Sequence, residues 1–303
     1  MAADRNLTSS IQQVLSKILC LTAGNILNIT TNNFPNTVQI ETTNACNAKC
    51  IICPHRTMKR ATKIMDDGVF KKVIDECAEH NCPNVHLHNF GEPLLDNKIV
   101  QRIKYAKEKG LRRIKIFSNG SLLTAEISKK LIAAGLDEIK ISFDGANKKE
   151  FERLRTPLKF DQIIDNIKTL VAVRNQMASP LKIEISCNST SDKSATMESL
   201  KNCVDKFSFG KLHNWSNAVI TSPGTSKTRK PCARIWRTFT VLADGKSSLC
   251  CLDFEGSVIL GDLGKSSIAE IWKNSQYLSL RKHHTDALQM NLAACSDCSK
   301  SFI

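Results

Sequence analysis

The chain has 303 residues, of which 42% are hydrophobic and 24% charged, a composition typical of a globular protein that can bury the core of one large α/β domain and a small appendage. Its net charge of +14 favours acidic or phosphorylated small molecules as partners, whereas an aromatic content of 6% and the lack of an arginine-rich tract argue against nucleic-acid recognition. The sequence contains no run of eighteen apolar residues, which excludes a membrane-spanning helix.

The first predicted element is a helix over residues 11–27, where apolar residues recur at roughly helical spacing. Polar residues interrupt this run and no small-residue cleavage site follows it, so we expect a helix packed on the body of the protein rather than a signal peptide. A helix that lies on a membrane surface is the alternative. We assign residues 1–36 to an N-terminal helical extension.

From residue 37 onward, short β-branched runs alternate with longer amphipathic segments. We predict strands over residues 37–41, 84–88, 113–117, 138–143, 182–186 and 210–215, and helices over residues 68–79, 97–109, 124–134 and 161–175. Six strand–helix units predict a parallel sheet with right-handed crossovers. The expected fold is therefore α/β, a partial (β/α)6 TIM-like barrel over residues 37–220, with its sites at the carboxyl ends of the strands.

Three cysteines, Cys46, Cys50 and Cys53, follow the first predicted strand with the spacing C-x3-C-x2-C. Three thiolates leave one iron of a four-iron cluster open to a ligand that is not protein, which favours one-electron chemistry. A zinc site completed by His55 is the alternative. The thirteen cysteines are odd in number and no export signal is present, so we expect reduced thiols in the cytoplasm rather than disulfides.

Polar motifs follow the next three predicted strands. They are Gly91-Glu92-Pro93, Ser118-Asn119-Gly120 and Ser142-Phe143-Asp144-Gly145. Because parallel strands end at the same rim, we expect a glutamate, hydroxyls, an amide and an aspartate to gather beside the cysteines. Such groups suit a polar cofactor that carries an ammonium, a carboxylate and a ribose.

In this order, the cysteines and the three motifs resemble the radical S-adenosylmethionine (SAM) superfamily over residues 37 to about 190. The resemblance implies a [4Fe-4S] cluster whose open iron chelates SAM, cleavage of SAM to methionine and a 5′-deoxyadenosyl radical, and an electron donor such as flavodoxin or ferredoxin. It also implies that Glu92 meets the SAM ammonium, that Ser142 and Arg155 are candidates for its carboxylate, and that Ser118 and Asp144 are candidates for its ribose side.

The last part of the chain predicts a smaller domain over residues 221–303. Residues 221–231 are polar and contain Pro, Gly and Ser, which indicates a linker. Two strands over residues 236–242 and 247–252 are joined by an Asp-Gly turn, and Ser267 with Glu270 forms a capping box that opens a helix.

Four further cysteines lie in this domain: Cys232, Cys250, Cys295 and Cys298. The spacing from Cys232 through Gly245 to Cys250 resembles the opening of the SPASM extension of the same superfamily. Because the sequence stops just after Cys298, the resemblance implies the shortened "twitch" form, a β-hairpin plus helix with one auxiliary [4Fe-4S] cluster. A zinc knuckle is the alternative. Four protein ligands would close this cluster to substrate and leave it to pass electrons.

Cys251 competes with Cys250 as the auxiliary ligand. Adjacent residues of a strand point to opposite faces, so we expect only one of the two to reach the cluster, and the spacing to Gly245 favours Cys250.

For catalysis the sequence offers three weak candidates. His86 and His88 would line the substrate cavity if they face the barrel interior, although a structural role is equally compatible. Cys187 could donate a hydrogen atom in an epimerase, or simply pack as a small residue.

We expect a cytoplasmic oxidoreductase that dehydrogenates a small hydroxylated substrate, such as a sugar, an aminocyclitol or a nucleotide-like compound, with the auxiliary cluster accepting the second electron. A ribosomal-peptide maturase and a redox-neutral epimerase are the alternatives. The roughly 36 residues before the first strand argue against the extra peptide-binding domain common in such maturases. A non-enzymatic zinc-binding module is the remaining class.

Overall fold

One sheet joins all the strands that the structure describes. Their bounds are β1 (Thr37–Ile40), β2 (Asn84–His86), β3 (Ile114–Ser118), β4 (Glu138–Ser142), β5 (Lys182–Asn188), β6 (Lys206–Gly210), β7 (Thr238–Val241), β8 (Lys246–Ser248) and β9 (Ile259–Asp262). Their order is β6-β5-β4-β3-β2-β1-β7-β8-β9. The computed structural model describes residues 2–145, 147–188, 192–201, 203–215, 218–219 and 228–301.

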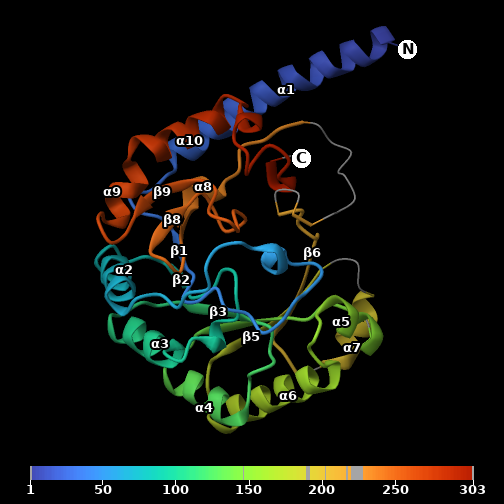
Figure 1. Ribbon diagram of the computed structural model, residues 1–303, viewed down its shortest axis with the longest axis vertical. Helices are drawn as coiled ribbons and strands as arrows, with labels where there is room; N and C mark the ends of the chain where they lie inside the picture. Colours follow the sequence, from blue (N-terminus) through green and yellow to red (C-terminus); the bar gives the residue numbers. More distant parts are fainter. Residues whose placement is uncertain are drawn as a thin grey trace.

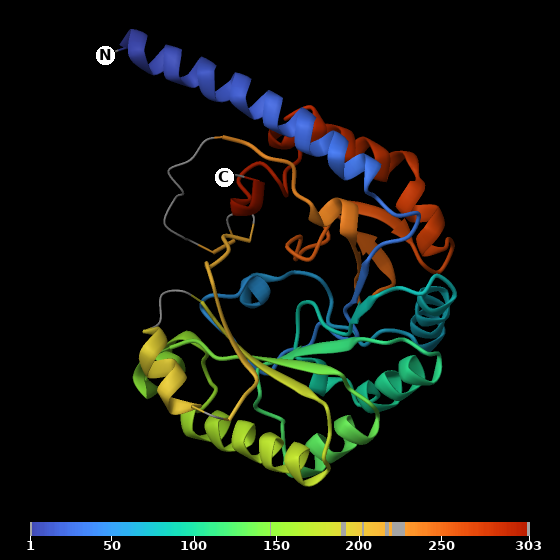
Figure 2. The ribbon, with the colours of Figure 1, turned by 180° about the vertical axis from the view of Figure 1, so that it is seen from behind.

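The first six strands are all parallel and form the partial barrel expected from the sequence. Helices cover its outer side (Figures 1 and 2). They are α2 (Asp67–Glu79), α3 (Ile99–Glu108), α4 (Ala125–Ala133), α5 (Lys148–Leu154), α6 (Phe160–Gln176) and α7 (Lys193–Ser199). Two details were wrong in the prediction: α5 and α7 were missed, and the last strand lies at Lys206–Gly210 rather than at 210–215.

The barrel strands alternate between an outer apolar face and an inner polar face. The outward residues are fully buried in the core under the helices: Val38, Ile40, Val85, Leu87, Ile114, Ile116, Ile139, Ile141, Ile183 and Ile185. The residues between them are mostly polar or charged: Gln39, Glu41, His86, His88, Lys115, Glu138, Lys140 and Glu184. A period of two therefore directs one set of side chains to the helices and the other to the barrel interior, where chemistry can be placed.

The C-terminal part extends the barrel sheet instead of forming a separate one. Strand β7 pairs with β1 in parallel, with Val38 opposite Phe239 and Ile40 opposite Val241. The predicted hairpin of β7 and β8 is present, and Gly245 makes its turn at a φ of +83° that glycine adopts readily. The third strand, β9, was not predicted.

Three helices complete this part: α8 (Arg234–Arg237), α9 (Ile268–Lys273) and α10 (Ser275–Thr285). The predicted capping box of Ser267 and Glu270 opens α9. The division into domains at residues 220 and 221 stays a prediction, because residues 220–227, which include most of the predicted linker, lie outside the described residues.

Helix α1 (Ala2–Ile29) lies alongside α10, as expected of a helix packed on the body (Figure 2). The two helices approach closely at Gly24, where a Cβ atom would lie 2.4 Å from Cγ2 of Thr285. Trp236 Nε1 of α8 donates to Asn28 Oδ1 (2.7 Å), which adds a polar contact. Across the described residues, each helix is too short or too polar to cross a membrane.

Candidate functional site

The first three cysteines lie on a loop, residues 41–65, that leaves the carboxyl end of β1; we call it the first cysteine loop. Backbone hydrogen bonds fasten it to the barrel rim at three points. Glu92 N donates to Ala45 O (2.7 Å), Lys49 N to Thr156 O (2.7 Å) and Ile51 N to Leu154 O (3.0 Å). The ends of β2 and α5 therefore hold the two sides of the loop.

The three thiols are close enough to affect one another. Burial raises the pKa of Cys46 to about 12 and that of Cys53 to about 11, and the neighbouring thiols raise both further. Burial likewise raises the pKa of Cys50, against the Arg155 guanidinium, which lowers it. Three neighbouring thiols with raised pKa values, of which Cys50 is buried and Cys46 and Cys53 are half-buried, need a cationic partner to hold negative charge, and an iron–sulfur cluster provides one.

The geometry does not favour the zinc alternative. Zinc ligands must meet about 2.0–2.3 Å from one point, and within the described residues no three His, Cys, Asp or Glu side chains form such a group. His55, the proposed fourth ligand, instead places Nε2 2.7 Å from Asn44 O. The thiolates of a four-iron cluster bind separate irons, so the donor set fits a cluster better than a single ion.

Arg155 links the first cysteine loop to the end of β4. Its Nε donates to Asp144 Oδ2 (2.8 Å), its Nη2 donates to the same oxygen, and its Nη1 lies 4.0 Å from Cys50 Sγ. Asp144 is 1% exposed and its other oxygen accepts from Asn188 N (2.5 Å). The two residues assigned to the SAM carboxylate and ribose are thus paired with each other at the edge of the cysteine site.

Glu92 and Ser118 also meet. Ser118 Oγ donates to Glu92 Oε1 (2.8 Å), and Asn119 N donates to Oε2 (2.7 Å). Burial raises the pKa of Glu92 to about 7, against these hydrogen bonds, which lower it. Ser142 is half-buried at the end of β4. The SAM contacts implied for Glu92, Ser118, Ser142, Asp144 and Arg155 stay predictions.

Sequence reasoning missed two sets of contacts at this rim. Asn119 Nδ2 donates to Asn47 Oδ1 (2.8 Å), which joins the end of β3 to the first cysteine loop. The buried Glu41 carboxylate accepts two hydrogen bonds from Arg60 (2.8 Å each). Glu41 could have been found from the sequence, because it is an acidic residue at the end of a predicted strand. No sequence pattern pointed to Arg60.

His86 and His88 face the barrel interior, the orientation that the sequence left open. Their rings stack at 5.4 Å, and His88 stacks on Phe117 of β3 at 4.0 Å. Burial lowers the pKa of His86 to about 4 and that of His88 well below its usual value, so both rings are neutral near pH 7. Cys187 packs in the hydrophobic core, and burial raises its pKa to about 12. Catalytic roles for these three residues stay predictions.

The buried Glu184 carboxylate is surrounded by three lysine ammonium groups, of which that of Lys206 is exposed. It lies 2.7 Å from Lys140 Nζ, 3.6 Å from Lys115 Nζ and 3.8 Å from Lys206 Nζ. Burial raises its pKa, but the hydrogen bond from Lys140 and the surrounding ammonium charges outweigh burial and lower the pKa to about 2.

The depressed pKa predicts an acid-sensitive contribution to stability. The Glu184 carboxylate stabilises the folded state above about pH 4.5, and this contribution falls as the pH drops toward 2, because the unfolded chain then binds the proton more tightly. Glu184→Gln is expected to lower the free energy of unfolding by on the order of 3 kcal/mol at pH 7, and this loss should become smaller as the pH is lowered toward 3. Urea unfolding at several pH values measures the loss. The control is Glu198→Gln, at an exposed glutamate. A loss of stability in Glu184→Gln that does not change with pH would contradict the prediction.

The cysteines of the C-terminal part also lie near one another. Cys232 precedes α8, Cys250 and Cys251 follow β8, and Cys295 and Cys298 lie buried near the C-terminus. Burial raises the pKa of each, and the thiols of Cys232, Cys250, Cys295 and Cys298 act electrostatically on one another. These interactions place the four thiols of the predicted ligand set in one region of the molecule, and their assignment as ligands stays a prediction.

The argument from strand alternation, by which only one of Cys250 and Cys251 could reach the cluster, was wrong. Strand β8 ends at Ser248, and its register against β9 shifts between Ser247 and Ser248, so strand alternation does not extend to Cys250 and Cys251. Cys251 Sγ accepts from Arg234 Nη1 (2.9 Å) and also acts on Cys232 and Cys250.

Paired substitutions separate the two thiols. We expect Cys250→Ala to lose the iron and acid-labile sulfide of one cluster, and Cys251→Ala to retain them, because Arg234 already holds the Cys251 sulfur. Iron and sulfide analysis after anaerobic reconstitution measures this. Loss of a cluster in Cys251→Ala with retention in Cys250→Ala would reverse the assignment.

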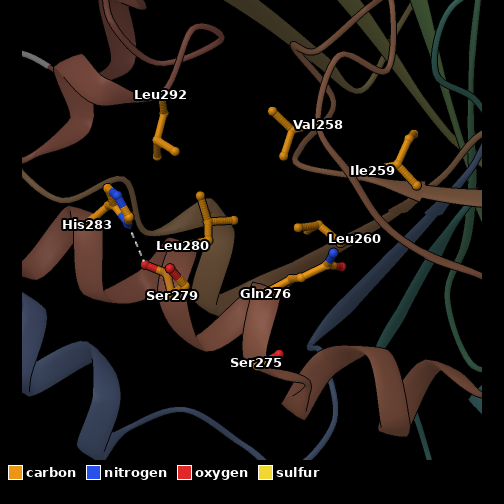
Figure 3. Close-up of a pocket in the computed structure, with 9 residues that line it drawn as sticks. All are labelled: Val258, Ile259, Leu260, Ser275, Gln276, Ser279, Leu280, His283 and Leu292. Atoms are coloured by element: carbon orange, nitrogen blue, oxygen red, sulfur yellow. Dashed lines mark hydrogen bonds between the residues drawn. The ribbon is translucent and has the colours of Figure 1, made fainter.

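An apolar cavity of about 460 Å³ lies elsewhere, between β9 and α10. Figure 3 shows Ile259 and Leu260 facing Leu280 and Leu292 across it, while His283 bonds to the backbone of Ser279. None of the predicted site residues lines this cavity, although Leu292, which does, accepts a hydrogen bond from Cys295 N (2.8 Å).

Both parts of the chain match known families. Residues 40–179 match the family model of the radical SAM superfamily, and residues 232–299 match that of the SPASM iron–sulfur cluster-binding domain. An AdoMet-dependent heme synthase from Methanosarcina barkeri is 33% identical over 47% of this chain and 41% of its own length. The chain thus matches less than half the length of this relative and of another, an uncharacterised protein from Methanocaldococcus jannaschii.

A third relative matches over nearly its whole length. The S-adenosyl-L-methionine-dependent 2-deoxy-scyllo-inosamine dehydrogenase of Niallia circulans is 22% identical over 86% of this chain and 92% of its own. Among solved structures, BtrN in complex with AdoMet and 2-DOIA has a TM-score of 0.62 at 19% identity, covering 87% of this chain and 92% of that one. Streptococcus suis SuiB bound to precursor peptide SuiA has a TM-score of 0.70 at 12% identity, covering 92% and 72%.

Proposed function

Because the chain belongs to the radical SAM superfamily and continues into a SPASM-type iron–sulfur domain, we propose that it oxidises a small hydroxylated substrate by two electrons. The preferred class is an aminocyclitol or sugar, in line with the 2-deoxy-scyllo-inosamine dehydrogenase that it matches over 92% of that relative's length. The residues proposed to hold the SAM-binding [4Fe-4S] cluster are Cys46, Cys50 and Cys53, and those for the auxiliary cluster are Cys232, Cys250, Cys295 and Cys298.

When bound, the first cluster and SAM supply hydrogen-abstracting radical chemistry. Oxidation of a secondary alcohol to a ketone removes one hydrogen atom, one proton and one electron. The neutral rings of His86 and His88 on the inner barrel face are our candidates to take the proton. The second set of cysteines provides a place for an electron acceptor, and an external low-potential protein such as flavodoxin or ferredoxin is the proposed donor to the first.

The observation that carries this proposal is direct contact between the two cysteine-bearing loops. Residues 249–258, which begin with Cys250 and Cys251, form the second cysteine loop. Arg60 Nε of the first cysteine loop donates to Phe254 O (2.8 Å), and Lys59 N donates to the Glu255 carboxylate (2.8 Å). This contact supports the proposal that a substrate-derived electron leaves by way of the second set of cysteines.

Replacement of Cys295 tests the proposal. Anaerobically reconstituted wild-type protein should convert 2-deoxy-scyllo-inosamine, or a related aminocyclitol or sugar, to a ketone with one 5′-deoxyadenosine formed per product. Cys295→Ala should keep the first cluster and cleave SAM, yet lose at least about 100-fold in ketone formation, since the electron has no acceptor. Half-buried Cys203→Ala is the matched control.

The product analysis distinguishes the alternatives. Ketone formation that persists in Cys295→Ala with a loaded first cluster would refute the role of the second set of cysteines. A product formed without oxidation would support an epimerase, and failure of every aminocyclitol and sugar alongside intact SAM cleavage would refute the substrate class.

A further inference from the structure

Helix α1 presents a wide apolar surface that nothing in the described structure covers. Ile11, Val14, Leu15, Ile18, Leu21 and Ile26 are 46–57% exposed, and Ile29 is 84% exposed. Together with Leu19 they occupy an arc of about 160° on a helix of 3.6 residues per turn. We call this set the apolar face of α1. It is wider than the narrow seam of a two-stranded coiled coil.

The opposite side of α1 makes the contact with the body, mostly with small residues and with one large apolar residue, Leu27, near its end. Ser16, Cys20 and Gly24 are buried, and Ser16 Oγ accepts from Arg229 N (2.8 Å). An ordinary surface helix turns its large apolar side chains inward and its polar ones outward. In α1 most of the large apolar side chains instead point outward, so packing among the described residues does not explain the apolar face.

Basic side chains border the apolar face. A groove of about 640 Å³ between α1 and α10 has a mostly polar lining, in which Leu21 of α1 and the 55% exposed Leu278 of α10 lie beside Lys273 and Lys282. Lys17 is exposed on α1 itself. Residues 11–29 and α10 contain no acidic residue, although Lys282 pairs with Asp286 just after α10 (2.6 Å).

We propose that α1 docks this protein on an anionic lipid surface, with the apolar face entering the region between headgroups and acyl chains and Lys17, Lys273 and Lys282 contacting the headgroups. An exposed apolar stripe with basic neighbours is the pattern of helices that lie in a membrane interface. A second copy of the chain fits less well, since each copy carries a net charge of +14 and pairing would bring these lysines together without acidic partners.

Vesicle binding by the full-length, cluster-loaded protein tests this proposal. Large unilamellar vesicles of phosphatidylcholine, with and without about one third phosphatidylglycerol, are sedimented at low and high salt. We expect binding to the anionic vesicles that weakens with salt, and an approximately tenfold lower partition for Leu15→Gln/Ile18→Gln. Both side chains are about half exposed, so the variant should fold; circular dichroism checks this. Met197→Gln, an equally exposed residue on α7, is the matched control.

Three results would overturn the proposal. They are no sedimentation with anionic vesicles, equal binding to neutral vesicles regardless of salt, and a homodimer by light scattering that Leu15→Gln/Ile18→Gln dissociates in the absence of lipid. The last result would assign the apolar face to a second copy of the chain. The readout does not involve catalysis, so it is independent of the proposed function.

Discussion

Gly91→Ala is expected to destroy the first cluster site. Gly91 has a φ of +102°, and a Cβ atom there would lie 2.6 Å from Thr43 O and 2.8 Å from Ala45 O, both backbone atoms of the first cysteine loop. Backbone cannot swing aside as a flexible side chain can, so the loop has to move away from the rim, and the hydrogen bond from Glu92 N to Ala45 O breaks with it. Backbone strain at a positive φ and overpacking against the loop should together lower the free energy of unfolding by about 3 kcal/mol or more.

The measurement for Gly91→Ala is iron content after reconstitution, together with the free energy of unfolding. Most of the iron of the first cluster should be lost while the auxiliary cluster remains. Gly110→Ala is a matched control, because Gly110 also has a positive φ (+84°) but a Cβ atom there would meet nothing within 4 Å. The Gly110→Ala substitution should lower the free energy of unfolding by about 1 kcal/mol and leave iron binding unchanged. Equal iron content in Gly91→Ala and Gly110→Ala would show that cluster binding does not depend on the close approach of Gly91 to the first cysteine loop.

Glu41→Gln is expected to cost about 3–5 kcal/mol of folding stability. The Glu41 carboxylate is fully buried and accepts from Arg60, from Phe90 N (3.3 Å) and from Ala243 N (2.9 Å). It therefore joins the first cysteine loop, the end of β2 and the turn between β7 and β8. Glutamine removes the charge and leaves the largely buried guanidinium of Arg60 without its anion, which is the costly way to break a buried ion pair.

Two further variants show whether the unpaired charge causes the loss. Glu108→Gln breaks an exposed pair with Lys104 and should leave the unfolding midpoint unchanged. Glu41→Leu/Arg60→Leu removes both charges, so it should recover part of the stability lost in Glu41→Gln, as apolar replacements of buried pairs do. If the double variant is less stable than Glu41→Gln, the two amide donors, and not the charge, hold the junction together.

The sequence predicted the barrel well because its strands carry two signals at once. Runs such as Ile114–Ser118 and Glu138–Ser142 are β-branched, and each ends in a polar motif. Strand β9 escaped prediction because it contains Gly261, a poor strand former. The structure gives the reason for this glycine: a Cβ atom there would lie 2.5 Å from Ile271 Cγ1 of α9.

The candidate site was predictable in its residue types but not in its pairings. The spacing of the three cysteines of the first cysteine loop was enough to predict one common site, because they lie within a segment of eight residues. The pairing of Asp144 with Arg155, and of Glu41 with Arg60, depends on how separate loops meet in three dimensions. Strand alternation likewise could not assign Cys251, because it follows the end of β8.

The pairing of β7 with β1 has a consequence for dividing this protein into fragments. Residues 238–241 supply the backbone partners of residues 37–40 along one whole side of that strand. A fragment that ended before Cys232 would leave β1 as an open sheet edge, with unpaired amides and carbonyls beside the thiols of the first cysteine loop, and open edges template aggregation. The amino-terminal part is therefore poorly suited to isolation, and the two parts have to be produced as one polypeptide.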